Sequence, residues 1–363
     1  NINLYNLTNN GTFRLQGGET TVAITEKDSD SGMVEYDGTG TYTAWLYGYT
    51  YYNLKFSGSG SWEAQGTITC NDFTATGGTP DIGDYQMTVS GNFEISGGTF
   101  NQDDSGSNYI ILAGSSKTAK STEIYYNPKR VKITGTYTTS GNFQYGNYYD
   151  NTNGKLLVDG GTLTNDSYLI YGYWASSGGL QTVNSGDISG SGAFYSYISA
   201  DANFETTSIS MSGIFNLYSY NSTEKYTLNG NVSMPNLDIA TYRRSVSVYT
   251  NTHNLTVKNI YFGDSSGGSE VYGDTLKLYM SSGTHTINGN LVLAPNNTSN
   301  THVLDFGSSN ITIKGDVDLS SIDVTPGTST VTLAGTSNQS ITSASQAFYN
   351  LTVTNNSSSP KVT

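Results

Sequence analysis

Residues Ile311–Leu319 read ITIKGDVDL, two short runs in which apolar and polar residues alternate on either side of a glycine. This glycine phrase recurs at Met87–Ile95 (MTVSGNFEI), Tyr226–Met234 (YTLNGNVSM) and His285–Leu293 (HTINGNLVL), and more loosely at Val131–Tyr137 (VKITGTY). Alternation with a period of two is typical of strands with one apolar face. A unit that recurs along a chain indicates a fold built by stacking.

The phrase predicts two strands joined by a corner. Ile311 and Ile313 precede the glycine, Val317 and Leu319 follow it, and both pairs are expected to face the interior. Gly315 marks the corner, because glycine allows the backbone angles that a sharp bend requires. A strand, a corner, a second strand and a variable loop make one coil of a β-helix.

A second phrase places Asn before Leu and another apolar residue two positions later. It occurs at Asn53–Phe56, Asn236–Ile239, Asn254–Val257 and Asn350–Val353, with a partial copy at Tyr5–Thr8. The Asn is expected at the turn into the strand, where its side chain can bond its own backbone. The 26 residues from Gly289 to Gly315 lie in the range of solenoid repeats.

The composition of the 363-residue chain predicts an all-β protein. Charged residues make up 12%, whereas Gly (42) and Tyr (29) are abundant and no long helical pattern occurs. No linker divides the chain, so residues 1–363 are expected to form one elongated β-repeat body, which is less regular and Tyr-rich over residues 1–130 and most regular over 226–363. The alternative fold is an antiparallel β-sandwich array, because Asn-Gly pairs such as Asn229-Gly230 are typical of hairpin turns.

The charge and the single cysteine limit the partners. With a net charge of −13 and only 16 Lys and Arg, the chain offers no basic patch for nucleic acid. Cys70 cannot form an internal disulfide and is interpreted as a small buried residue. No apolar run is long enough to cross a bilayer. The first residue is Asn rather than Met, so we expect a piece of a longer chain whose anchor or further domains lie elsewhere.

Asn-x-Ser/Thr sites are frequent and cluster after residue 220. The thirteen glycosylation candidates are Asn6, Asn10, Asn165, Asn221, Asn231, Asn254, Asn296, Asn297, Asn310, Asn338, Asn350, Asn355 and Asn356. Glycans would solvate a surface that is poor in charge. These sites, the low charge and the many Thr and Tyr indicate an extracellular or cell-surface protein of an archaeal or bacterial envelope.

Few residues predict chemistry. Asp28 and Asp30 alternate before Gly32 as in the first part of a calcium loop, but Thr39 stands where the final acidic ligand belongs, so they are weak Ca²⁺ candidates and no other cofactor is expected. His253, His285 and His302 lack metal-site spacing. No arrangement of carboxylates predicts catalysis, and we expect no enzyme activity.

The tyrosine clusters are the candidate contact residues. Aromatic rings can stack on sugars, stack across neighbouring strands, or pack against a second subunit, and the last two interpretations are favoured. The selected residues are Tyr47, Tyr49, Tyr51, Tyr148, Tyr149, Tyr171 and Tyr173.

Together, Phe348–Val353 and Thr286–Leu291 resemble the repeats of right-handed parallel β-helix surface proteins of archaea and bacteria, namely adhesin-like, S-layer and sheath proteins. The resemblance is clearest over residues 226–363 and fainter before residue 130. It implies a right-handed parallel β-helix at the cell surface. We therefore expect a structural protein that self-assembles with copies of itself into an envelope layer, sheath or fibre. A glycan-binding adhesin is the alternative, and a carbohydrate-active β-helix enzyme is the third possibility.

Overall fold

The computed structural model consists of parallel β-strands stacked as a β-solenoid of about 13 turns, and no helix occurs in the part of the chain that it describes. The described residues are all except 1, 20–21, 46, 104–106, 123–127, 147–153, 175–178, 199–201, 207–208, 220–223, 242–244, 264, 266–274, 295–300 and 359–361. The chain divides into two compact units, residues 1–173 (unit 1) and 174–363 (unit 2).

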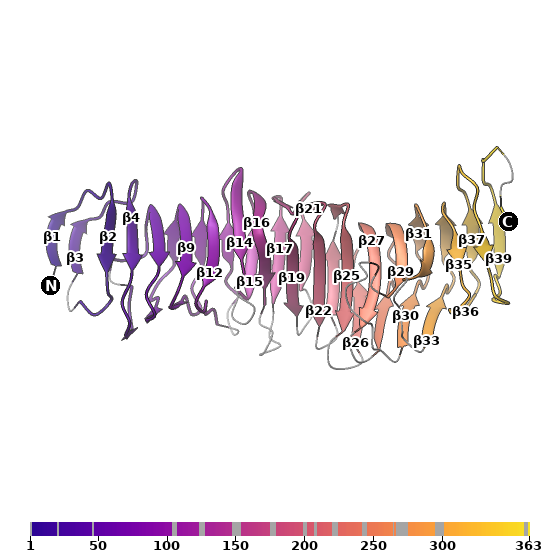
Figure 1. Ribbon diagram of the computed structural model, residues 1–363, viewed down its shortest axis with the longest axis horizontal. Coiled ribbons are helices and arrows are strands. Elements are labelled where there is room, and N and C mark those ends of the chain that lie inside the picture. Colours follow the sequence, from indigo (N-terminus) through magenta and orange to yellow (C-terminus); the bar gives the residue numbers. More distant parts are fainter. Residues whose placement is uncertain are drawn as a thin grey trace. The chain divides into compact units, whose positions relative to one another are not determined.

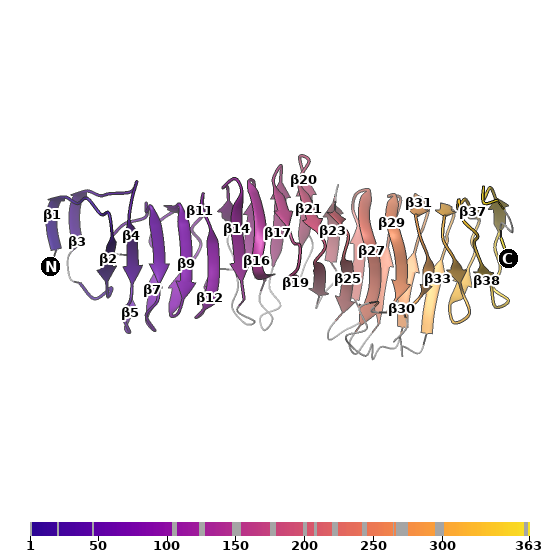
Figure 2. The ribbon, with the colours of Figure 1, turned by 45° about the horizontal axis from the view of Figure 1, so that its top comes forward.

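Unit 1 has three strand faces (Figures 1 and 2). The first face contains β1 (Ile2–Asn6), β3 (Val22–Glu26), β8 (Ile68–Cys70), β11 (Met87–Val89), β13 (Ile110–Leu112), β15 (Arg130–Ile133) and β17 (Lys155–Asp159). The second contains β2 (Thr12–Leu15), β4 (Met33–Tyr36), β6 (Asn53–Phe56), β9 (Asp72–Thr76), β12 (Phe93–Gly97), β14 (Lys117–Ser121), β16 (Thr136–Tyr145) and β18 (Thr162–Thr164). The third contains β5 (Thr41–Tyr42), β7 (Ser61–Glu63) and β10 (Thr79–Asp81), while β19 (Leu169–Trp174) pairs with the end of β16.

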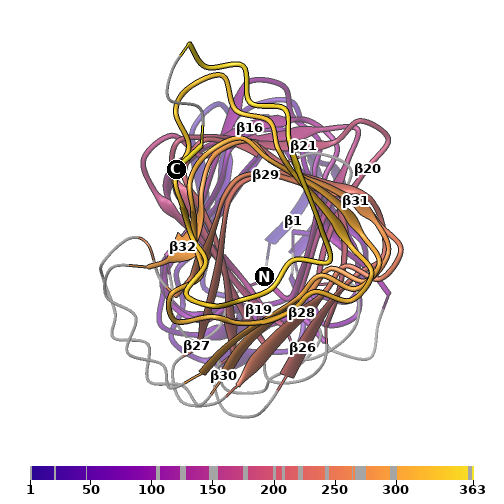
Figure 3. The same cartoon turned by 90° about the vertical axis from the view of Figure 1, so that its right-hand side faces the viewer.

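Unit 2 repeats this order, and Figure 3 shows its strands surrounding a common interior. The first face contains β20 (Leu180–Val183), β23 (Ala202–Thr206), β26 (Glu224–Leu228), β28 (Val246–Tyr249), β30 (Thr275–Tyr279), β33 (Thr301–Asp305) and β36 (Asp323–Thr325). The second contains β21 (Asp187–Gly190), β24 (Ser210–Met211), β27 (Val232–Thr241), β29 (Leu255–Phe262), β31 (Thr284–Ile287), β34 (Asn310–Ile313), β37 (Thr330–Leu333) and β39 (Asn350–Val353). The third contains β22 (Ala193–Ile198), β25 (Ile214–Ser219), the second halves of β27 and β29, β32 (Leu291–Leu293), β35 (Val317–Asp318) and β38 (Ile341–Thr342).

Strand pairing within each unit is parallel throughout the described residues, which confirms the β-helix prediction and excludes the antiparallel sandwich. Asn229-Gly230 and Asn288-Gly289 join strands of successive faces and do not form hairpins. Leu54 pairs with Phe73, 19 residues further on, whereas Ile260 pairs with Leu291, 31 residues further on. Coil length therefore varies mainly through the loops.

The core consists of columns of residues that occupy the same position in successive coils. In unit 2, Ile311 pairs with Val331, which pairs with Leu351, and the first two are at most 1% exposed. In unit 1 the rings of Phe73 and Phe93 are stacked in register, with centroids 5.6 Å apart. The predicted inward positions of the glycine phrase are confirmed, since Ile313, Val317 and Leu319 are also buried.

The glycine phrase marks a corner, but not always the same one. Met87–Ile95 and Tyr226–Met234 lead from the first face to the second. His285–Leu293 and Ile311–Leu319 lead from the second face to the third. Alternation and glycine thus specify a local bend, while the position of that bend within the coil depends on the length of the adjacent loops.

The glycine at the corner has a different physical role from the one predicted. None of Gly91, Gly289 and Gly315 has a positive φ, so the bend itself does not require glycine. A Cβ on Gly315 would lie 2.3 Å from Asn290 Oδ1 and 2.4 Å from the carbonyl carbon of Gly289, one coil away. Real Cβ atoms essentially never approach other atoms this closely. Close approach of the neighbouring coil therefore requires glycine there.

Amide side chains link the corners of successive coils. Asn259 Oδ1 accepts a hydrogen bond from the backbone N–H of Asn290 (2.7 Å), Asn290 Oδ1 from that of Asp316 (2.8 Å), and Asp316 Oδ1 from that of Ser340 (2.7 Å). In the second phrase, Asn254 Oδ1 likewise accepts from the backbone N–H of Thr284. The prediction that these Asn side chains bond their own backbone is wrong, because the next coil presents an unpaired N–H at each corner.

Gly315→Ala should destabilise unit 2 by about 1–3 kcal/mol, because the added methyl group overlaps backbone and Asn290 of the preceding coil. The measurement is urea-induced unfolding followed by circular dichroism. Gly230→Ala is the matched control, since a Cβ there meets nothing within 4 Å and Gly230 has no positive φ. Equal losses of stability in the two variants would contradict the close-approach explanation.

Candidate functional site

A hollow of about 400 Å³ opens on the first face of unit 1. Thr69 on β8 and Thr88 on β11 lie side by side in register and contribute outward hydroxyl groups. Asp30, in the loop that follows β3, and Tyr52, immediately before β6, complete the lining with a carboxylate and an aromatic ring. Two rigid parallel strands therefore support a polar surface next to a ring.

The hollow offers groups suited to hydrogen bonding and ring stacking. The side chain of Tyr52 is 38% exposed, whereas the neighbouring Tyr51 is 3% exposed and donates its hydroxyl hydrogen to the carbonyl of Gly48. Asn71 donates from Nδ2 to Asn53 Oδ1 (3.2 Å), which orients its amide. The described lining contains no Lys, Arg or His. The surface is thus suited to a neutral, hydroxyl-rich ligand.

Asp28 and Asp30 have structural surroundings that the sequence did not indicate. Asp28 Oδ2 accepts hydrogen bonds from the backbone N–H of Asn9 (2.6 Å) and from Ser31 Oγ (3.1 Å), and Oδ1 accepts from the N–H of Asp30 (3.1 Å). The bonds from the Asn9 and Asp30 backbone lower the pKa of Asp28 to about 2. Its hydrogen bond with Asp30 and its charge raise the pKa of Asp30. Asp28 fastens this loop to the preceding coil.

Among the described residues, no three His, Cys, Asp or Glu side chains gather in a group that could hold a metal ion. Asp28 and Asp30 therefore have no third acidic ligand in that part of the chain. Cys70 is buried, as predicted, and burial raises the pKa of its thiol.

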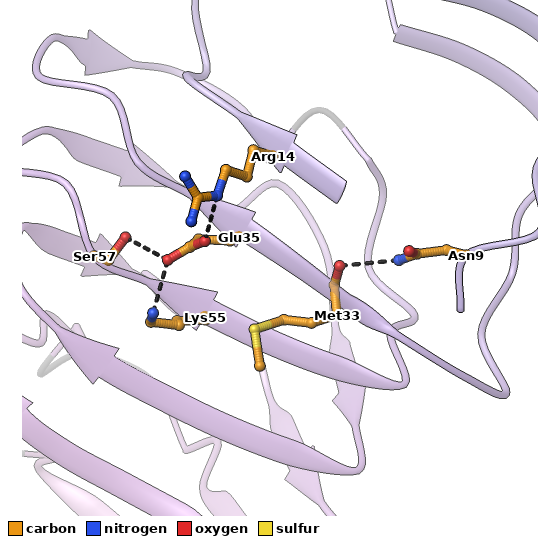
Figure 4. A network of polar contacts seen from close by, with 6 residues as sticks. All are labelled: Asn9, Arg14, Met33, Glu35, Lys55 and Ser57. Carbon is orange, nitrogen blue, oxygen red and sulfur yellow. Dashed lines mark hydrogen bonds and ion pairs between the residues drawn. The ribbon is translucent and has the colours of Figure 1, made fainter. Parts of the chain in front are cut away.

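A buried carboxylate at Glu35 is a polar cluster that sequence analysis missed. Figure 4 shows Glu35 between Arg14 and Lys55, which come from neighbouring strands β2 and β6, with Ser57 beside them. The ion-pair distances are 2.9 Å to Arg14 Nε and 2.8 Å to Lys55 Nζ. Burial would raise the pKa of Glu35, but the hydrogen bonds from Lys55 and Ser57 and the two positive charges lower it overall. The three residues are 20 or 21 positions apart, so only the coil register could have revealed the cluster.

The strands at the free edges of both units expose apolar side chains. Leu4 (39%) and Tyr5 (78%) lie on β1, while Leu351 (45%) and Val353 (53%) lie on β39, directly after Tyr349 (60%). The described chain has eight exposed large apolar or aromatic side chains, and these five lie on or beside two strands. Apolar exposure is therefore concentrated at the edges of the sheets.

Two of the tyrosine contact candidates are corrected by the structure. Tyr47 is fully buried and Tyr51 is 3% exposed, and their rings stack on each other in the interior of unit 1. The Tyr-rich run folds inward because its aromatic rings, with Trp45, fill the coil interior. Tyr49 is half-buried and accepts a hydrogen bond from the Gln65 N–H.

The other tyrosine candidates remain open. Tyr171 and Tyr173 are half-buried on β19. Tyr148 and Tyr149 lie outside the described residues.

The glycosylation candidates differ in accessibility. Asn165 is fully buried and donates from Nδ2 to the Tyr168 carbonyl; Asn355 is 3% exposed and donates from Nδ2 to Ser337 O and Gln339 Oε1. A glycan on either nitrogen would break these bonds, which removes both sites from the candidates in the folded chain. Asn6, Asn10, Asn231, Asn254, Asn310, Asn338, Asn350 and Asn356 are exposed, whereas Asn221, Asn296 and Asn297 lie outside the described residues.

His285 is buried in an apolar column of unit 2. Its Nδ1 accepts from the N–H of Leu255 (3.2 Å) and its Nε2 donates to the carbonyl of Met280 (2.8 Å), so the ring is neutral. Burial lowers the pKa of His285 and also that of His302, which donates from Nδ1 to the Ser321 carbonyl. Both rings have structural surroundings.

Acidification should therefore destabilise unit 2. The folded pKa of His285 lies below the ordinary value of about 6.5, so the unfolded chain binds more protons as the pH falls through that value. The free energy of unfolding should be highest above pH 6.5 and decrease towards pH 5, as measured by urea denaturation. His285→Leu should reduce this slope. His253→Leu is the control, and a slope equal to wild type in His285→Leu would contradict the assignment.

No helix in the described part of the chain has the length and apolar character needed to span a bilayer. Comparison of the chain with family models, curated proteins and solved structures yields no match.

Proposed function

We propose that this chain is a structural protein of the cell surface that assembles with copies of itself through the open edges of its β-solenoid units. The observation that carries the proposal is the concentration of exposed apolar side chains on β1 and β39. Low charge content and exposed Asn-x-Ser/Thr sites support an extracellular location. We assign it no catalytic activity.

The edge at β39 has the form of an interior surface. Leu351 and Val353 occupy the same columns as Val331 and Leu333, which are at most 1% exposed because a further strand covers them. β39 pairs with β37 on one side, and its other edge carries unpaired backbone groups in the described structure. Such an edge is a template for another strand.

The edge at β2 of a second copy is complementary to β39. Both are four-residue strands on second faces, and in both the second and fourth residues point inward: Phe13 and Leu15 in β2, Leu351 and Val353 in β39. Parallel pairing that overlaps all four residues places Leu351 on Phe13 and Val353 on Leu15. A one-residue shift would turn both apolar pairs towards water, so this register is favoured.

The expected contact is weak at low concentration. Leu351 and Val353 are about half exposed, and covering each contributes about 1 kcal/mol. Association costs about 4–15 kcal/mol in lost freedom of motion. The apolar columns therefore need the added hydrogen bonds of the whole coil face, and assembly should depend on a high local concentration, as on a cell surface.

Leu351→Lys should suppress assembly at least about tenfold in concentration, because it places a charge in the column that a second copy must cover. Light scattering and negative-stain electron microscopy over a concentration series measure this. Thr352→Ala, which alters an outward residue of the same strand, should assemble like wild type. A wild-type protein that stays monomeric at high concentration would refute the proposal.

The register is tested by pairing Thr12→Cys with Asn350→Cys, because directly opposed residues of paired strands lie within disulfide range. The double variant should form intermolecular disulfides under mild oxidation, detected as a non-reducing ladder on gels. Each single variant and wild type control for Cys70. Assembly without cross-linking would preserve the structural role and reject this register.

A further inference from the structure

We propose that the hollow on the first face of unit 1 binds a neutral sugar ring of a glycan, stacked on Tyr52. This inference is independent of the assembly edges, because it depends on a different surface and on different residues. The ligand class follows from the lining chemistry: one exposed aromatic ring, a carboxylate, an amide and hydroxyl groups, with no cationic side chain among the described lining residues.

Tyr52 provides the stacking surface. It is 38% exposed, while its backbone is fixed because its carbonyl accepts the N–H of Asn71 (2.7 Å). The neighbouring Tyr51 is held by its bond to the Gly48 carbonyl and by stacking on Tyr47 at 5.7 Å. An aromatic ring on a fixed backbone can cover the apolar face of a pyranose and lose little conformational freedom.

Polar groups around Tyr52 can read the hydroxyl groups of a sugar. Asp30 accepts hydrogen bonds, and its loop is fastened to the preceding coil through Asp28 and Asn9. Thr88 and Thr69 present hydroxyl groups from paired strands, and Thr69 bonds back to Thr50 Oγ1 (3.4 Å). These groups combine donors with acceptors, as sugar hydroxyls require.

The charge of the site selects against acidic sugars. Asp30 is the charged side chain of the lining and is negative when ionised. A sialylated or sulfated ring placed beside it would meet a like charge with no described cation in the lining to offset it. A neutral hexose or pentose residue meets no such penalty.

The volume also bounds the ligand. A space of about 400 Å³ lies at the lower end of the usual range for small-molecule sites, about 300–1,000 Å³. It suits a short glycan segment rather than a long chain. Single-site binding should be weak, and several copies in an assembled surface would raise the avidity.

The test is binding of the purified full chain to immobilised oligosaccharides with neutral termini (glucose, galactose, mannose or xylose), beside sialylated and sulfated ones. Saturable binding to at least one neutral terminus is expected, followed by titration of the best soluble oligosaccharide by calorimetry. Tyr52→Ala should weaken binding about tenfold, because the stacking contact is lost. Tyr52→Phe keeps the ring and should stay within about threefold of wild type.

Tyr168→Ala is the matched control, since Tyr168 is 40% exposed in the same unit and lies outside the hollow. It should bind like wild type. Thermal melting of all variants separates loss of binding from loss of folding. Failure to bind any neutral terminus, a preference for acidic glycans, or full binding by folded Tyr52→Ala would each overturn the proposal.

Discussion

Parallel hydrogen bonding between successive coils is the constraint on which the rest of the structure depends. It sets coils about 4.8 Å apart, so each residue lies directly against its counterpart in the next coil. Residues in one column must therefore tolerate each other as neighbours. Aliphatic side chains, stacked rings such as Phe73 and Phe93, and bonded amides such as Asn259 and Asn290 all satisfy this requirement.

The same constraint explains the corners. Where the chain turns, the regular ladder is interrupted and backbone N–H groups would remain unpaired, so Asn and Asp side chains accept them from the next coil. Where the neighbouring backbone comes closest, only glycine fits, as at Gly315. The proposed assembly extends this constraint, because the columns that end at Leu351 and Val353 can continue into a second copy.

The hollow arises where the repeat is interrupted. The Tyr-rich run near residue 50 sends Tyr47 and Tyr51 inward to pack the coil and leaves Tyr52 outside. The loop that carries Asp30 folds back because Asp28 bonds Asn9 of the preceding coil. A surface on which a flat ring and hydrogen-bonding groups converge therefore comes from the irregular part of the chain, while the regular strands supply its rigid base.

The sequence by itself determined the all-β class, the parallel coil, the inward positions of the glycine phrase and the burial of Cys70, because a period of two and turn residues act locally. Only the tertiary structure decided which corner each phrase forms, the burial of Asn165 and Asn355, and the cluster at Glu35. It also decided the composition of the hollow. These features depend on which residue of the next coil lies opposite, and loops of unequal length set that register.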